Sequence, residues 1–449
     1  MDHPFACPRG GVHDVANGWE DVEPWLRRNQ QAVAPGSEDH YSNLYRPGQL
    51  LVSKADEHDV RDALRSRART DQEPDDHTTE CLDTLGLARV RVEEPRDEFE
   101  PPLPALVEQL QQEHGLRVHL NQVLVSAFHV HVGPATPPRP ADPGEFPDVR
   151  PLSRMIAATG DPVKVLVLDT GLADDDVVRQ QILKGRCDGD PKAAQLSDPL
   201  PRSVGHGTFI AGLICRHSDG TRVEVRDVVD ECGFIDDPAL ACELAKVDDT
   251  VDLLNLSFGG YGLGGEMVAT IAQLKALTIR NPELVIVAAA GNDGRDRPFL
   301  PAALPNVIAV GAVEHRPDGS YHPTCFTNRG RLVDACAVGA DVVSTFPHFS
   351  GDLAAVEPPP SCQEPGASVT AALTSGSFNR RARWSGTSFA APLVTAAIAQ
   401  RMTTDGRSAR EAVRDLLLDP QAKRIPGLGV LVKPPPLFPP GAAPPGADG

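Results

Sequence analysis

The sequence lacks the features that mark several classes of protein. Its N-terminus, Met1-Asp2-His3-Pro4-Phe5, has neither a basic n-region nor an apolar h-region, so we expect no classical signal peptide. No apolar run approaches the ~20 residues that a membrane-spanning helix needs, so we expect no membrane partner. No stretch is rich in Lys or Arg, and the formal net charge is −19. Such a surface repels phosphate backbones, so we expect no nucleic-acid partner.

The cysteines give no sign of a disulfide framework or a metal site. There are nine of them, an odd number, scattered along the chain without a Cys-x-x-Cys pair. Scattered cysteines are typical of reduced thiols that pack as small hydrophobic groups. Together with the missing signal peptide, they predict a cytoplasmic location. The oligomeric state stays open.

The chain divides at a proline-dense stretch, residues 134–150, which predicts a semi-rigid linker. Residues 1–48 show no clear periodicity and are left unassigned. Residues 49–133 alternate in the order strand, helix, strand, helix, strand, which predicts a small α+β domain of ferredoxin-like type. At the other end, residues 434–449 are rich in Pro, Gly and Ala, and we expect a disordered tail.

Residues 151–433 predict a larger domain. Here apolar strands alternate with helices, the pattern of a parallel sheet that is covered on both faces. We therefore expect a three-layer αβα domain with a mostly parallel sheet. The clearest buried strands are expected at residues 163–168, 223–229, 251–256, 284–289 and 307–310.

Three segments of the large domain carry reactive side chains at the ends of these elements. Asp169 follows a buried strand directly, and ligand-binding groups of open α/β sheets gather at that edge. His206 stands between two glycines at the start of an apolar helix. Ser388 falls in the first turn of a further helix, where unpaired N–H groups and the helix dipole favour an oxyanion. The alternative is that Ser388 or Thr387 only caps this helix.

Taken together, the three side chains predict nucleophilic catalysis. A serine nucleophile needs a base to take its proton and a carboxylate to orient that base. Asp169, His206 and Ser388 supply these groups in the order Asp, His, Ser, which distinguishes one lineage of catalytic triads from the others. Asp-Thr-Gly or Gly-His-Gly alone would be a weak signal, whereas the combination is specific.

The segments resemble a known family over most of the chain, about residues 151–433. Asp169-Thr170-Gly171, Gly205-His206-Gly207-Thr208 and the motif from Gly386 to Pro392 are similar to the three signature motifs of the subtilisin-like serine peptidases (subtilases, peptidase family S8). Asn255-Leu256-Ser257-Phe258-Gly259-Gly260 resembles the substrate-binding strand of that family, and Ala289-Ala290-Gly291-Asn292 resembles its oxyanion motif. Phe389 departs from the family, which often has Met there, and this affects the expected shape of the pocket.

The resemblance implies roles for further residues. Asn292 would donate its side-chain amide to the oxyanion beside the backbone N–H of Ser388, although a residue at this position of a Gly-Asn-Asp-Gly stretch could also serve only as a turn residue. The other implied residues bind substrate. Ser257, Phe258 and Gly259 would pair with an extended substrate, while Ala290 and Gly291 leave room for a pocket with an apolar or broad preference.

The resulting hypothesis is a serine endopeptidase that acts on proteins or peptides through an acyl-enzyme. Residues 49–133 have the size and position of the family's cleaved pro-region, so self-processing is expected; a permanent interaction domain is the alternative. A non-catalytic peptide-binding protein on the same fold and a protein that cleaves only itself are rival readings. No organic cofactor and no metal ligand are assigned. Asp174-Asp175-Asp176 could bind calcium, but a helix N-terminus explains these acids better.

Overall fold

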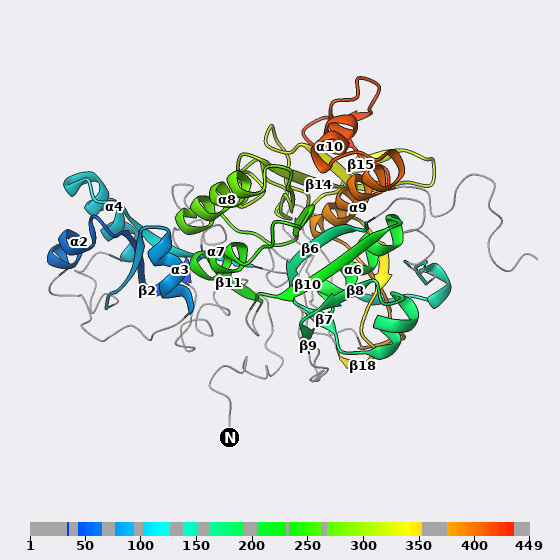
Figure 1. Ribbon diagram of the computed structural model, residues 1–449, viewed down its shortest axis with the longest axis horizontal. Helices are drawn as coiled ribbons and strands as arrows, with labels where there is room; N and C mark the ends of the chain where they lie inside the picture. The colour runs from blue at the N-terminus through cyan, green and yellow to red at the C-terminus, as the bar shows by residue number, and fades with distance from the viewer. Residues whose placement is uncertain are drawn as a thin grey trace, which may run out of the picture.

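The computed structural model describes residues 34–35, 44–64, 77–93, 102–125, 138–146, 148–150, 152, 161–192, 204–229, 233–261, 267–352 and 375–434. They form a large domain on a ten-stranded sheet and a small domain on a five-stranded sheet. In Figure 1 the small domain is blue to cyan, and the large domain runs from green to red.

The large sheet confirms the expected strands and their parallel arrangement. Its strand order is β21-β22-β16-β14-β13-β12-β6-β10-β8, with β15 beside β14. All neighbours pair in parallel except β15 with β14 and β21 with β22. The strands are β6 (Val163–Asp169), β8 (Cys187–Gly189), β10 (Thr221–Asp227), β12 (Leu253–Leu256), β13 (Val285–Ala289), β14 (Val307–His315), β15 (Tyr321–Pro323), β16 (Ala335–Val338), β21 (Arg424–Ile425) and β22 (Gly429–Leu431).

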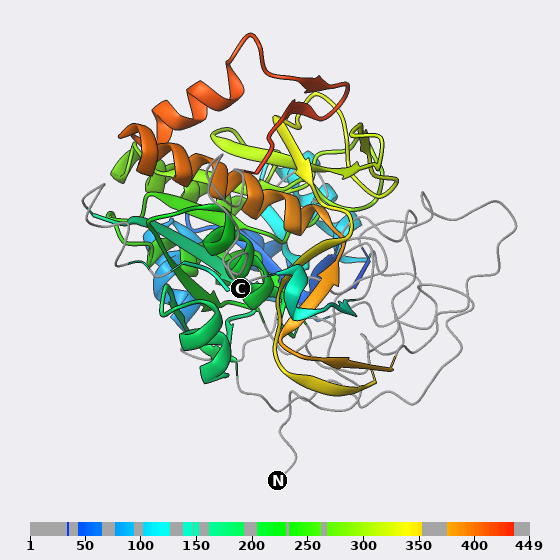
Figure 2. The ribbon, with the colours of Figure 1, turned by 90° about the vertical axis from the view of Figure 1, so that its right-hand side faces the viewer.

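Helices cover both faces of this sheet. Alternate residues of the central strand β6 separate the two hydrophobic clusters: Val165 and Val167 pack with α6 and α9, whereas Leu166 and Leu168 pack with α7 and α8. The expected three-layer αβα architecture is therefore confirmed. Figure 2 shows α9 (orange) crossing the sheet. The helices are α6 (His206–His217), α7 (Asp237–Ala245), α8 (Val268–Arg280), α9 (Thr387–Asp405) and α10 (Ala409–Leu417).

The segment that we expected to be a linker, residues 134–150, is part of the large domain wherever it is described. Its strand β5 (Arg139–Pro140) pairs with β20 (Arg381–Trp384), which leads directly into α9. Phe146 and Val149 are buried in the main core. The dense prolines therefore mark a segment packed on the surface of this domain, because backbone pairing and two apolar side chains hold it there.

Short strands complete the edge of the large domain. Strand β17 pairs with β20, and strand β18 pairs antiparallel with β19 in the part of the chain that precedes Ser388. Strands β7 and β9 pair in parallel near Asp169. Their bounds are β7 (Leu172–Ala173), β9 (Pro191–Lys192), β17 (Val342–Thr345), β18 (Phe349–Asp352) and β19 (Ser375–Phe378).

The small domain has the expected α+β character, with one additional helix, α3. Helix α4 ends at Gly115, whose φ of 65° is the left-handed conformation that favours glycine. Strand β2 begins at Leu44, inside the region left unassigned. The elements are β1 (Ala34–Pro35), β2 (Leu44–Ser53), α2 (Glu57–Ala63), α3 (His77–Thr84), β3 (Leu87–Arg91), α4 (Leu103–His114) and β4 (Val118–Val125). Residues 126–133 and 435–449, including most of the expected tail, lie outside the described residues.

The two domains share one antiparallel sheet. Strand β11 (Phe234–Asp236) belongs to the large domain and pairs with β4 of the small one. Helix α3 packs on α7, and a small apolar cluster joins Leu51 and Leu82 to Ala241 and Ala269. No helix among the described residues is long and apolar enough to cross a membrane.

Candidate active site

Asp169 and His206 lie together at the carboxyl edge of the sheet. Asp169 is the last residue of β6, and His206 is the first residue of α6. The imidazole Nδ1 of His206 is 2.8 Å from Oδ1 and 3.0 Å from Oδ2 of Asp169. Both side chains are fully buried. With Nδ1 protonated, the carboxylate accepts this hydrogen, which leaves Nε2 as the basic nitrogen of the ring.

Gly207 allows the helix to approach the strand this closely. A Cβ on Gly207 would lie 2.5 Å from the carbonyl oxygen of Gly171. Its backbone N–H donates to Thr170 Oγ1 at 2.9 Å. The second glycine of the Gly-His-Gly motif is therefore needed for steric reasons, because any side chain at Gly207 would clash with the backbone of Gly171.

Ser388 lies in the first turn of α9, as expected, but its hydroxyl does not donate to His206. It donates to the carbonyl oxygen of Ser257 at 2.9 Å, and Ser257 Oγ donates to the carbonyl oxygen of Ser388 at 3.0 Å. The buried Nε2 of His206 has no hydrogen-bond partner among the described residues. Proton transfer thus requires the Ser388 hydroxyl to rotate away from Ser257, and catalytic hydrogen bonds often form only when substrate is bound.

Aromatic rings surround the imidazole of His206. The ring of Trp384 meets it edge to face at 5.5 Å between centroids, and the ring of Phe389 lies at 5.4 Å. Phe209 packs against both of these aromatic rings. Because all three are buried, they restrict the plane of the imidazole and keep bulk water away from it.

Asn292 follows strand β13 and is oriented by Thr387. Its Oδ1 accepts hydrogen bonds from the backbone N–H of Thr387 at 2.8 Å and from Thr387 Oγ1 at 2.9 Å. Thr387 Oγ1 in turn accepts from the backbone N–H of Gly291 at 3.2 Å. With the oxygen held in this way, the nitrogen is the group of the Asn292 amide that would donate to an oxyanion.

The five residues expected to bind substrate are all buried, but they differ in what their side chains contact. Ser257 is hydrogen-bonded to Ser388, as described above. Phe258 packs into the hydrophobic cluster beneath the sheet, so only its backbone is left to contact a substrate. Gly259, Ala290 and Gly291 follow the ends of the neighbouring strands β12 and β13. A Cβ on Gly259 would lie 2.4 Å from the carbonyl oxygen of Leu300, and a Cβ on Gly291 would lie 2.4 Å from Asn328 Nδ2.

Four further residues near this site were not predicted from the sequence: Tyr261, Asp293, Phe299 and Asn328. The Tyr261 hydroxyl donates to Asp293 Oδ2 at 2.5 Å and accepts from Asn328 Nδ2 at 2.7 Å. Burial raises the pKa of Asp293 to about 7. Burial, followed by the Asp293 charge, raises the pKa of Tyr261 above its usual range. Asn328 belongs to a stretch that resembles a family turn, and Asp293 adjoins Asn292; these were the available signals.

The acidic stretch Asp174-Asp175-Asp176 precedes a helical turn, η2 (Val177–Ile182). Asp175 Oδ1 accepts from the backbone N–H groups of Val177 and Val178, at 2.9 and 3.3 Å, and its Oδ2 pairs with Arg380 at 2.8 Å. This arrangement agrees with the interpretation as a helix N-terminus. The described residues contain no group of three or more His, Cys, Asp or Glu suited to a metal ion. Calcium binding stays a prediction.

The described residues form an αβα protein in which Asp169 and His206 are hydrogen-bonded, and the first turn of α9, which carries Ser388, contacts both His206 and Asn292. The model of the subtilase family (Peptidase_S8) matches residues 160–426, more than half of the chain. The chain therefore belongs to the subtilase family of serine peptidases.

Individual relatives agree with this assignment. The thermophilic serine proteinase of Bacillus sp. strain AK1 is 30% identical over 248 residues, 53% of this chain and 51% of that protein. Subtilisin BL of Lederbergia lenta is 30% identical over 201 residues, 42% of this chain and 68% of the relative. The chain thus spans about half the length of the first of these relatives.

A solved structure supports the fold. Fervidolysin from Fervidobacterium pennivorans, described as a keratinolytic enzyme related to subtilisin, matches with a TM-score of 0.54 at 18% sequence identity. The match covers 87% of this chain and 60% of that chain. This match covers more of the chain than the family model, which matches residues 160–426. The likeness in fold therefore extends beyond the peptidase domain.

The prediction of a cytoplasmic location is wrong. The subtilisin relatives that the chain matches are mostly secreted, extracellular proteases. The expectation of reduced thiols also fails at Cys325, which is disulfide-bonded, and such bonds form in oxidising compartments. Scattered positions alone could not reveal this bond, because partners that are distant in sequence come together only in the fold.

Proposed function

We propose that the chain is a serine endopeptidase that hydrolyses peptide bonds of proteins or peptides through an acyl-enzyme. The observation that carries this proposal is the buried hydrogen bonding of His206 Nδ1 to both carboxylate oxygens of Asp169. Burying a carboxylate against an imidazole is costly unless the two are hydrogen-bonded, and buried pairs of titratable groups cluster at functional sites. The opposite nitrogen of the ring, Nε2, is buried and has no hydrogen-bond partner among the described residues, which leaves it able to accept a proton.

In the proposed reaction, Ser388 Oγ attacks the carbonyl carbon of the scissile bond while His206 Nε2 takes its proton. Asp169 stabilises the resulting imidazolium and keeps its own negative charge. Nε2 then gives the proton to the leaving amine, and the acyl group remains on Ser388. Water, deprotonated by the same nitrogen, hydrolyses this ester and restores the serine hydroxyl.

The oxyanion of the tetrahedral intermediate would be held by Asn292 and the backbone N–H of Ser388. The bonds from Thr387 to Asn292 Oδ1 fix the amide before the substrate arrives. A preorganised donor needs no reorientation when the charge develops, which makes it effective in a buried site. The proposed reaction needs no organic cofactor.

We further propose that the small domain is a pro-region that the chain removes from itself. Strand β4 of this domain pairs with β11 and ends beside the substrate-binding segment: a Cβ on Gly260 would lie 3.0 Å from the carbonyl oxygen of Val123. The end of β4 therefore lies next to the segment proposed to bind substrate. Cleavage within residues 126–137 would separate the small domain from the rest of the chain.

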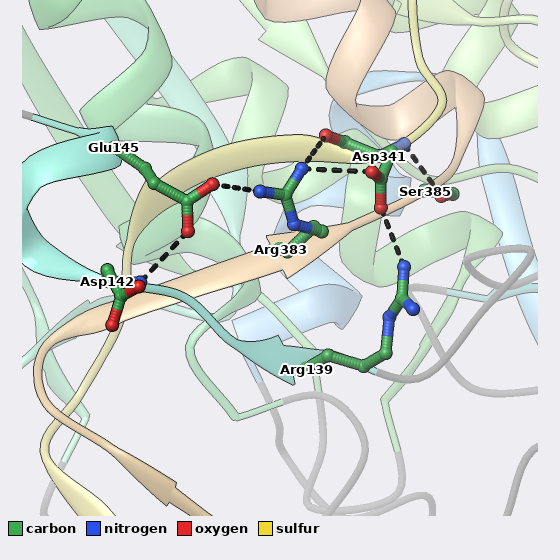
Figure 3. A network of polar contacts seen from close by, with 6 residues as sticks. All are labelled: Arg139, Asp142, Glu145, Asp341, Arg383 and Ser385. Carbon is green, nitrogen blue, oxygen red and sulfur yellow. Dashed lines mark hydrogen bonds and ion pairs between the residues drawn. The ribbon is translucent and has the colours of Figure 1, made fainter.

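The segment after this stretch is held on the large domain by a polar network, shown in Figure 3. Arg383 pairs with Asp341 at 2.9 Å and also with Glu145. Arg139 pairs with the other oxygen of Asp341 at 2.6 Å. Asp341 N–H donates to Ser385 Oγ, three residues before the nucleophile. We therefore expect residues 138–150 to stay with the peptidase domain after cleavage.

One observation favours the rival reading, a non-catalytic peptide-binding protein. The Ser388 hydroxyl donates to the carbonyl oxygen of Ser257 and not to His206. A second reading of the small domain, a permanent interaction domain, is equally compatible with the shared sheet. Both rivals differ from our proposal in what the purified protein does.

The test combines intact mass with hydrolysis of a denatured protein substrate. We expect the wild type to lose its N-terminal region by a cut within residues 126–137 and to digest the substrate. Ser388→Ala should stay whole and inactive. Ser408→Ala is the matched control, since Ser408 caps the N-terminus of α10 and should behave as wild type. An intact wild type that digests the substrate would refute the pro-region, whereas a wild type without any hydrolysis would refute the peptidase.

A further inference from the structure

The ring of Phe299 packs against two glycines, Gly259 and Gly291, of the segments proposed to bind substrate. A Cβ on Gly259 would lie 2.4 Å from Phe299 Cε1, and a Cβ on Gly291 would lie 2.9 Å from Phe299 Cγ. The ring is only 3% exposed. The ring is therefore in close contact with both segments, the one that follows β12 and the one that follows β13.

The backbone fixes the ring in this place. Leu300, the next residue, exchanges two hydrogen bonds with Gly260, at 2.8 and 2.9 Å. Phe299 is thus attached to the same segment that would pair with the substrate. To move away, the ring would have to break these backbone hydrogen bonds or rotate about its side-chain torsions into the protein interior.

Tyr261 holds the ring from the far side. The two rings meet edge to face, with centroids 5.2 Å apart and an interplanar angle of 71°. The Tyr261 hydroxyl is anchored by Asp293 at 2.5 Å and by Asn328 at 2.7 Å. Asn328 also donates to the carbonyl oxygen of Ala290 at 2.9 Å. The ring of Phe299 therefore packs against a tyrosine that two hydrogen bonds hold in place.

The proposed chemistry places the substrate against this ring. The attacked carbonyl carbon must come within about 3 Å of Ser388 Oγ, with its oxygen at the amide of Asn292. A substrate strand that pairs along residues 257–259 then directs the side chain of the acyl residue, the residue on the amino side of the scissile bond, into the gap between Gly259 and Gly291. Phe299 already occupies that gap.

We infer that Phe299 restricts the acyl residue of the substrate to glycine, alanine or serine. This inference rests on the proposed endopeptidase activity. A larger side chain would have to displace a buried ring that packs against Tyr261 and the two glycines. A single methylene in a tight pocket changes kcat/KM by about 10–200-fold. The inference revises the apolar or broad preference expected from the small residues of the β13 segment.

The test compares two chromogenic peptides that differ only at the acyl residue, alanine or phenylalanine. For the wild type we expect kcat/KM to favour alanine by about 100-fold or more. Phe299→Ala should raise kcat/KM for the phenylalanine peptide at least about tenfold relative to the alanine peptide. Phe299→Leu removes less volume, keeps the site folded if the alanine variant does not fold, and should shift the ratio in the same direction. Phe349→Ala, which truncates a buried phenylalanine of β18, is the matched control and should leave the ratio unchanged.

Three results separate the inference from the proposed function. Equal kcat/KM values of the wild type for both peptides would overturn the role of Phe299 and leave the peptidase assignment standing. An unchanged ratio in both Phe299 variants would do the same. A wild type that cleaves neither peptide nor a denatured protein would overturn the proposed function itself.

Discussion

Replacing Asp293 by asparagine should remove a pH-dependent loss of stability. Asp293 is buried next to the proposed oxyanion amide; its Oδ2 accepts from Tyr261, and its Oδ1 has no partner among the described residues. Burial raises its pKa from 3.8 to about 7, against smaller lowering effects of the Tyr261 hydrogen bond and the charges of Arg295 and Arg297. Asn keeps the shape and the acceptor for Tyr261 but does not ionise.

The sign and size of the effect follow from linkage. An acid whose pKa is higher in the folded than in the unfolded state contributes stability that is present below about pH 4 and is lost as the pH rises through about 7. The shift is about 3 pH units, and each unit corresponds to about 1.4 kcal/mol, so the loss is at most about 4 kcal/mol. The free energy of unfolding of the wild type should therefore fall by several kcal/mol over this range because of this residue alone.

The assay is chemical unfolding between pH 4.5 and 8, with both proteins in the Ser388→Ala background to prevent digestion. The difference in free energy of unfolding between the Asn variant and its parent should grow with pH and level off above about pH 7. Asp237→Asn is the control, because burial raises the pKa of Asp237 only to about 6 and its difference should level off about one unit lower. A difference for Asp293→Asn that is flat over the whole range would refute the reasoning.

Further predictions concern catalysis and processing. Asn292→Ala should lower kcat by about 10²–10³-fold with little change in KM, the loss known for the oxyanion amide of subtilisin itself; an unchanged kcat in steady-state assays would rule out its role. Asp169→Asn should lower kcat by about 10⁴-fold, since the buried partner no longer selects the right tautomer, and a loss below tenfold would contradict the pairing. Gly207→Ala should abolish peptide hydrolysis, because its Cβ would lie 2.5 Å from the Gly171 carbonyl oxygen; full activity would show that the helix can shift. The released N-terminal fragment should end on a small residue of 126–137, and mass spectrometry that finds an aromatic or charged end would contradict the role of Phe299.

Much of the large domain could be predicted because its signals are local. The alternation of Val165, Leu166, Val167 and Leu168 marks a strand buried on both faces, and those side chains do separate the two helical layers. In the small domain, Gly115 ends α4 because its backbone takes a positive φ. The reactive residues were also identifiable, since each stands directly at the end of a strand or the start of a helix.

What the sequence could not provide depends on contacts between distant segments. Phe299 contacts Gly259 and Gly291 because three loops come together in the fold. The sequence of each loop alone does not predict these contacts. The proline-dense composition of residues 134–150 concealed two apolar side chains, Phe146 and Val149, that hold the segment on the core. The hydrogen bond from Ser388 to Ser257 likewise depends on the rotation of the Ser388 hydroxyl, which a sequence motif does not determine.

The central claim is that Ser388 is a nucleophile activated by His206, and covalent labelling tests it most directly. A fluorophosphonate probe should add a single mass to the wild type, and peptide mapping should place that mass on Ser388. His206→Ala should slow the labelling at least a hundredfold, and Ser388→Ala should abolish it. A folded wild type that stays unlabelled, or one labelled at another serine, would contradict the account.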